Sequence, residues 1–107
     1  MNNERTILSF LVAGMNSEFF DDKNSATVVL DEIRNVISTF GSISVDAICD
    51  IYEKHTSTHF DKVYHNINYR WYSIKNFKFV EAINCRTGSP YYRISIAIPS
   101  NIKEETA

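Results

Sequence analysis

The chain has 107 residues, a formal net charge of −2 and 44% hydrophobic residues. A chain of this length folds as one domain around one core, which excludes a cofactor domain beside a separate substrate domain. The charge is divided unevenly, because positions 1–53 hold three Lys or Arg against nine Asp or Glu (−6), and positions 54–107 hold eight against four (+4). A small surface with two signs favours contact with a charged partner over a buried catalytic pocket.

We expect a soluble, cytoplasmic protein that does not bind membranes. The apolar run from Ile7 to Ala13 is too short to span a bilayer and lacks a small-residue cleavage site after it. Without an export signal, the two cysteines, Cys49 and Cys85, are expected to be reduced and buried. The polar end of the chain shows no periodicity, so we predict a single domain over residues 1–99 and a flexible tail over residues 100–107.

A first helix is predicted over residues 3–18, where apolar residues recur at intervals of three and four. The recurring residues are Ile7, Phe10, Leu11, Met15 and Phe19, which mark one apolar face expected toward the core. The polar residues that follow, 21–24, predict a turn.

Two more helices are predicted within the acidic part of the chain, residues 1–53. The first begins after Ser25 as N-cap and ends at Phe40, because Gly41 stands where a left-handed residue is favoured. Its apolar stripe consists of Val29, Ile33, Val36, Ile37 and Phe40. The second is a short helix from Ser44 to Glu53, which would direct four residues to the core: Val45, Ile48, Ile51 and Tyr52.

A β-hairpin is predicted near the end of the chain. Residues 77–84 are rich in aromatic and β-branched types, residues 86–90 have the composition of a turn, and residues 91–98 alternate. The alternation directs Tyr92, Ile94, Ile96 and Ile98 inward and Tyr91, Arg93, Ser95 and Ala97 outward. Residues 55–68 fit either a turn with a short helix or an irregular crossing.

These elements predict an α+β fold, with two or three N-terminal helices followed by a C-terminal antiparallel β-hairpin. Their order is that of a winged helix, with residues 86–90 as the tip of the wing. A convincing recognition helix is missing, because residues 55–68 lack a long amphipathic stripe and carry Lys62 as their only full positive charge.

No pattern in the chain predicts an enzyme. Cys49 and a histidine offer a thiol nucleophile and a base, but Cys49 falls on the apolar side of a helix and is better explained as a buried structural residue. A zinc site could combine His55 and His59 with Cys49 and Cys85, although only the histidine pair has the usual ligand spacing. The three glycines are isolated and form no phosphate cradle. We therefore expect no catalytic residue, no metal site and no cofactor.

The candidate binding residues lie in the basic half, where cations alternate with aromatic rings. They are Arg70, Trp71, Tyr72, Lys78, Arg86, Tyr91 and Arg93. Such residues suit phosphate contact and base stacking, but they also dominate protein interfaces, and the chain as a whole is acidic. A lone tryptophan is usually buried, so Trp71 is also a core candidate. We predict a non-enzymatic module that binds another protein, with winged-helix-like nucleic-acid binding as the alternative.

Three segments resemble a pattern in small bacteriophage-encoded proteins of unassigned function. They are Phe40–Asp46, Tyr69–Ile74 and Gly88–Pro99, with Arg70 standing where the pattern has a glycine. The resemblance implies a phage or prophage origin and the cytoplasm of a host bacterium. It also implies a host or virion protein as the partner, and a defence nuclease is one host protein of this kind. It supplies no catalytic residues.

Overall fold

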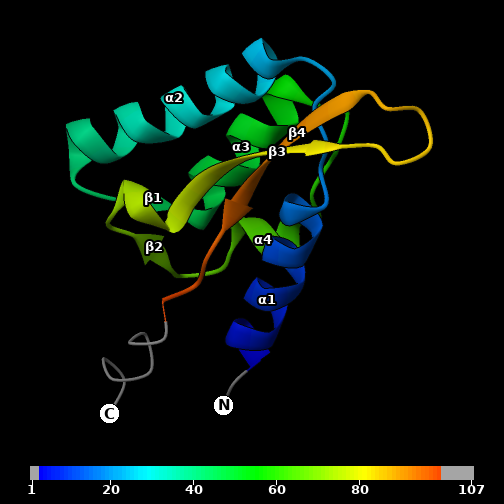
Figure 1. Ribbon diagram of the computed structural model, residues 1–107. Coiled ribbons are helices and arrows are strands. Elements are labelled where there is room, and N and C mark those ends of the chain that lie inside the picture. The colour runs from blue at the N-terminus through cyan, green and yellow to red at the C-terminus, as the bar shows by residue number, and fades with distance from the viewer. Residues whose placement is uncertain (1–2, 100–107) are drawn as a thin grey trace.

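The computed structural model describes residues 3–99, so the predicted tail lies outside the described residues. Figure 1 shows the α+β fold that the sequence predicts, with the helices first and a long hairpin last. The helices are α1 (Asn3–Asn16), α2 (Lys23–Phe40), α3 (Val45–His55) and α4 (Lys62–His65), with a 3-10 turn at Ile74–Asn76. The strands form two antiparallel pairs, β1 (Ile43–Ser44) with β2 (Arg70–Trp71) and β3 (Phe77–Ile83) with β4 (Pro90–Ile96).

Helix α2 begins earlier than predicted. Its N-cap is Asp22, whose carboxylate accepts a hydrogen bond of 3.1 Å from the backbone N–H of Asn24, and Ser25 lies inside the first turn. The negative charge of the Asp22 carboxylate also interacts favourably with the positive end of the helix dipole. This explains why Asp22, and not Ser25, is the N-cap.

The end of α2 at Gly41 and the N-cap of α3 at Ser44 are as predicted. Gly41 has a φ of 85°, and its N–H donates to the carbonyl of Ile37 at 2.8 Å. Two residues of β1 follow, and the hydroxyl of Ser44 then accepts a hydrogen bond of 3.1 Å from the N–H of Ala47 to cap α3. The left-handed Gly41 turns the chain sharply after α2, and α3 then packs against α2.

The core lies between the helices and the hairpin. It includes Leu8, Leu11, Val12 and Met15 of α1, Val29 and Ile33 of α2, Ile48, Ile51 and Tyr52 of α3, and Trp71, Phe77, Ile94 and Ile96. The predicted stripes are wrong at Phe10 and Phe40, whose exposed fractions are 67% and 74%. Phe10 lies two residues from Leu8 and from Val12, about 200° around the helix from each, so it faces away when they are buried.

Strand β4 is held on both of its edges. Its partner on one side is β3, in a register that places Phe79 opposite Ile94. On the other side Phe20 exchanges two backbone hydrogen bonds with Tyr92, at 2.7 and 2.9 Å. The amide of Asn16 continues this edge, because it accepts from the N–H of Ile96 at 2.7 Å and donates to the carbonyl of the same residue at 3.2 Å. The end of α1 is thereby fixed to the hairpin.

The arrangement differs from a winged helix in two respects. Strand β1 pairs with β2 and not with the hairpin, and α4 is a single turn of four residues. A helix of this length cannot fill a major groove, so residues 55–68 hold no recognition helix, as their sequence predicts. Over the same residues, no helix combines the length and the hydropathy that crossing a membrane requires.

Candidate functional site

The predicted binding residues in β2 and directly after it do not form an exposed surface together. Trp71 has an exposed fraction of only 1%, and its indole N–H donates to the carbonyl of Ala97 at 2.9 Å. Its inclusion among the binding residues is therefore wrong, since a side chain this buried cannot touch a partner. Arg70 donates from Nε to the hydroxyl of Ser42 at 2.7 Å, and Tyr72 beside it is exposed.

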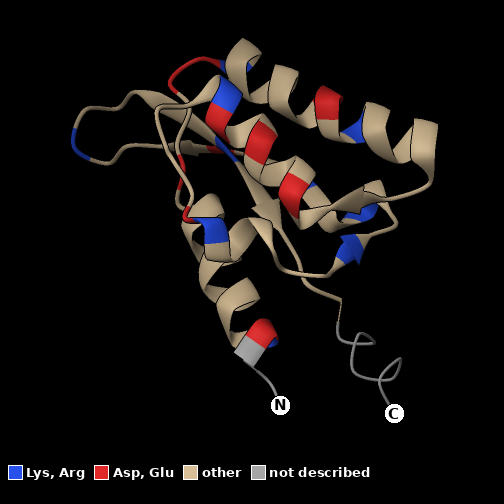
Figure 2. Cartoon of the chain, turned by 180° about the vertical axis from the view of Figure 1, so that it is seen from behind, with Lys and Arg blue, Asp and Glu red and all other residues tan. Residues whose placement is uncertain are grey.

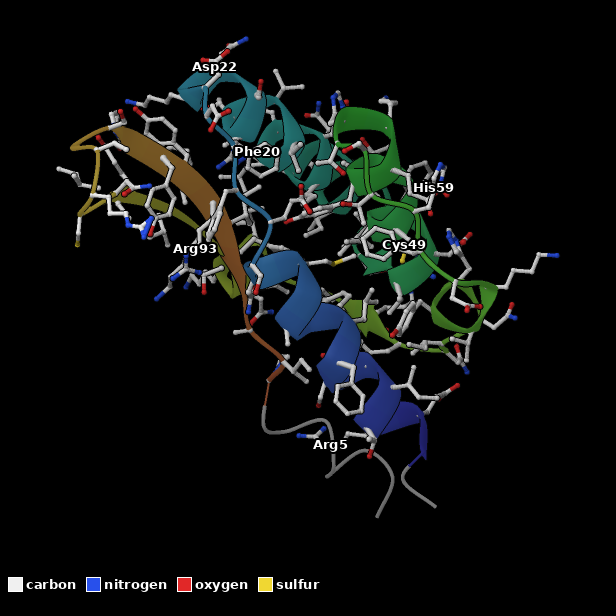
Figure 3. All side chains as sticks on the ribbon, turned by 90° about the vertical axis from the view of Figure 1, so that its right-hand side faces the viewer. Arg5, Phe20, Asp22, Cys49, His59 and Arg93 are labelled. Carbon is white, nitrogen blue, oxygen red and sulfur yellow. The ribbon has the colours of Figure 1, made fainter. Side chains whose placement is uncertain are left out.

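The hairpin brings the other predicted residues closer together. Lys78 pairs with Ser95 and Val80 pairs with Arg93, so the two cations lie on the same face of the hairpin. Figure 3 shows Arg93 on the side of β4 that faces away from the helices. Tyr91 shares this face by alternation, and Arg86 lies in the exposed turn.

An exposed apolar surface adjoins these residues at the far end of the hairpin. The ring of Phe19 packs edge-on against that of Tyr91, with 4.7 Å between their centres. Phe19 and Ile83 have exposed fractions of 57% and 64%, and with Tyr91 and Pro90 they line an open hollow of about 530 Å³. We call Phe19, Ile83, Pro90 and Tyr91 the hairpin patch.

Phe19 was expected in the core, and the structure corrects this assignment. It precedes Phe20 in an extended connection between α1 and α2, and neighbouring residues of extended chain point to opposite sides. Phe20 is buried against the core, so Phe19 must face outward. The two adjacent phenylalanines were the sequence signal that one of them would be exposed.

A second candidate site lies on the exposed side of α3. Red positions recur along this helix in Figure 2. The imidazole of His65, on α4, places Nδ1 2.5 Å from Asp46 and 3.8 Å from Asp50, and places Nε2 3.3 Å from Glu53. The hydrogen bond with Asp46, supported by the one with Glu53, raises the pKa of His65. The pKa of Glu53 is lowered, chiefly because its carboxylate accepts from the backbone N–H of Phe60.

Another carboxylate joins α2 to the end of α3. Glu32 forms ion pairs with Lys54 at 3.0 Å and with His55 at 2.5 Å. The hydrogen bond with His55 is the main reason why the pKa of Glu32 is lowered. This carboxylate therefore has a structural role, because it holds two core helices together.

Cys49 is a poor nucleophile, and the four predicted zinc ligands do not come together. Cys49 is buried, and burial together with the neighbouring carboxylates raises the pKa of its thiol to about 12. Cys85 is exposed in the hairpin turn, which corrects its predicted burial. Within residues 3–99, Asp46, Asp50 and His65 form the only group of at least three His, Cys, Asp or Glu residues whose ligand atoms are close enough to share an ion. The set of two cysteines and two histidines is therefore not assembled.

No protein-family model, curated protein or solved structure matches this chain. Its function is therefore inferred from its own residues.

Proposed function

We propose that this protein is a non-enzymatic, phage or prophage encoded module that binds another protein through the hairpin patch. The observation that carries the proposal is the grouping of Phe19, Ile83 and Tyr91 at one exposed place. Apolar side chains that gather on a surface mark interaction sites, and aromatic side chains are the commonest anchors of protein interfaces. We take the partner to be a host protein in the bacterial cytoplasm, such as a defence nuclease, on the strength of the resemblance to phage proteins.

The charges around the hairpin patch are consistent with a protein partner. Arg86 lies in the turn that joins β3 to β4, Arg93 shares a face of β4 with Tyr91, and Asp21 lines the same hollow as the patch. The acids of α3 lie away from the hairpin tip (Figure 2). Apolar anchors with a charged rim are the usual anatomy of an interface. The high pKa of the buried Cys49 thiol also leaves the chain without the nucleophile that its sequence could have offered.

Nucleic-acid binding through the hairpin is the second candidate. It is favoured by the common face of Lys78, Tyr91 and Arg93, because cations beside a half-buried aromatic ring can hold phosphates while the ring stacks on a base. It is weakened by Arg70, which lies on the other sheet and is hydrogen-bonded to Ser42. The four basic candidates therefore do not form a continuous track.

Capture from bacterial lysate, with and without nuclease treatment, tests the proposal. We expect a protein to stay bound after nuclease treatment. The Tyr91→Ala variant should weaken this binding by about 1 to 3 kcal/mol with a modest dependence on salt, since an aromatic anchor works through desolvated packing. Tyr72→Ala is the matched control, because it removes an exposed tyrosine that follows β2, outside the hairpin patch, and should leave capture unchanged.

The nucleic-acid alternative makes the opposite prediction. Tight binding to random-sequence DNA or RNA would weaken steeply with salt, because each phosphate contact releases counterions. A variant with Ala at Arg70, Lys78, Arg86 and Arg93 would abolish that binding. This pair of results, or loss of every captured protein after nuclease treatment, would overturn the protein-binding proposal.

A further inference from the structure

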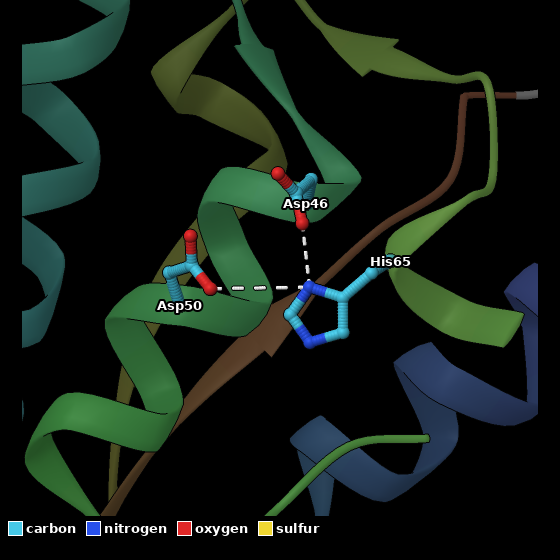
Figure 4. A group of neighbouring side chains, drawn as sticks. All are labelled: Asp46, Asp50 and His65. Carbon is cyan, nitrogen blue, oxygen red and sulfur yellow. Dashed lines mark hydrogen bonds and ion pairs between the residues drawn. The ribbon is translucent and has the colours of Figure 1, made fainter. Parts of the chain in front are cut away.

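The contact between α3 and α4 brings together three side chains that bind metals. Asp46 and Asp50 are four residues apart on α3 and so share one side of the helix. Nδ1 of His65 points between their carboxylates from α4, as Figure 4 shows. One ligand atom from each of the three residues lies within 4.8 Å of the other two.

The imidazole of His65 is oriented by a carboxylate on the nitrogen that faces away from the two aspartates. Its other nitrogen, Nε2, is 3.3 Å from the carboxylate of Glu53, which is itself fixed by the N–H of Phe60 at 2.7 Å. A carboxylate on the far nitrogen of a histidine is the usual support of a metal-binding imidazole, because it places the proton there and aims the free lone pair at the ion. This support distinguishes the site from a row of exposed acids.

The charges of the site also call for a cation. Within residues 3–99, the acids Asp46, Asp50 and Glu53 form ion pairs with His65 and with no lysine or arginine. Three carboxylates thus share one imidazole, which carries at most a single positive charge. A divalent ion between the two aspartates and Nδ1 would neutralise them directly.

We propose that Asp46, Asp50 and His65 bind one divalent transition-metal ion, of which Zn²⁺ is the representative. Bonds of about 2.0 to 2.2 Å in a tetrahedral arrangement place ligand atoms about 3.4 Å apart. Nδ1 now lies 2.5 Å from one aspartate and 3.8 Å from the other, so shifts of exposed side chains suffice. The mixed nitrogen and oxygen ligands favour Zn²⁺ over Mg²⁺ and Ca²⁺, which prefer oxygen alone. The site is independent of the hairpin patch.

The test is a calorimetric titration of ZnCl₂ into untagged, chelator-treated protein, with the melting temperature measured in parallel. The protein carries Cys85→Ser, because the exposed thiol could bind zinc by itself. We expect saturation at one Zn²⁺ per chain, a higher melting temperature with zinc, and no displacement by millimolar Mg²⁺. Asp50→Asn and His65→Gln should each weaken binding tenfold or more, and Glu53→Gln should weaken it about 10- to 100-fold.

The matched control is His55→Gln, which removes the other histidine that pairs with a carboxylate and should leave zinc binding unchanged. Asp50→Asn keeps the experiment decisive even if loss of His65 unfolds the α3–α4 contact, because Asp50 is exposed and lies 3.8 Å from the ring. Absence of saturable binding, or zinc affinity that survives Asp50→Asn in the folded variant, would overturn the proposal.

Discussion

Replacement of Ile33 by alanine measures how strongly α2 is held by its buried face. Ile33 is fully buried, in one cluster with residues of α1, α3 and β4. The substitution removes three aliphatic carbons, which at about 0.8 kcal/mol each lose about 2.4 kcal/mol of transfer free energy. If neighbours fill half of the roughly 80 Å³ that is vacated, the remaining cavity adds about 1 kcal/mol at 24 cal/mol per Å³. We therefore expect a loss of about 3 to 4 kcal/mol in the free energy of unfolding.

Urea denaturation followed by circular dichroism is the appropriate assay, with Phe40→Ala as the control on the same helix. Phe40 is the larger side chain, but most of it is in solvent, so its removal should change stability by less than about 0.5 kcal/mol. The melting temperature of Ile33→Ala should fall by more than about 10 °C. The packing assignment fails if Phe40→Ala costs as much as Ile33→Ala, or if Ile33→Ala melts within a degree or two of the parent.

Three further predictions concern polar groups. Tyr52→Phe should leave the stability unchanged or raise it by up to about 1 kcal/mol, because the buried hydroxyl has no hydrogen-bond partner within residues 3–99; a clear loss in urea denaturation would contradict this. Asn16→Ala should cost about 1 to 3 kcal/mol through the two hydrogen bonds to Ile96, whereas alanine at the exposed Asn35 should cost little in the same assay. The lowered pKa of Glu32 stabilises the fold above the ordinary carboxyl value of 4.5, and this contribution is lost as the pH falls through the folded-state pKa. Glu32→Gln should therefore cost stability at neutral pH and progressively less as the pH falls below 4.5, and a cost that does not change with pH would refute the ion-pair interpretation.

The features that could be predicted from the sequence depend on neighbouring residues. Gly41 and Ser44 set the end of α2 and the start of α3 through hydrogen bonds that span four residues or fewer. The hairpin could be predicted in the same way, because the alternation around Ile94 and the turn residues before Tyr91 lie in one continuous segment. Local signals of this kind are present in the chain before any tertiary contact forms.

The features that could not be predicted depend on contacts between distant segments. His65 falls in residues 55–68, where the sequence fits either a turn with a short helix or an irregular crossing, and nothing near it indicates that α4 turns it toward Asp46 on α3. The exposed Phe10 likewise shows that helical spacing alone does not determine which of two apolar faces is covered. The hairpin patch was half found: Tyr91 was named from the sequence, whereas its partner Phe19 was placed in the core.

The attachment of α1 to β4 also constrains the order in which the protein can fold. Asn16 and Ile96 are 80 residues apart in the chain, so closing this contact has a high entropic cost and should be among the later steps. At about 5 to 20 residues per second, a ribosome needs about 4 to 16 s to add that length of chain. During this time the apolar side of α1 has no β4 to cover it. The new chain would then expose Leu8 and Leu11 to chaperones and proteases until β4 emerges.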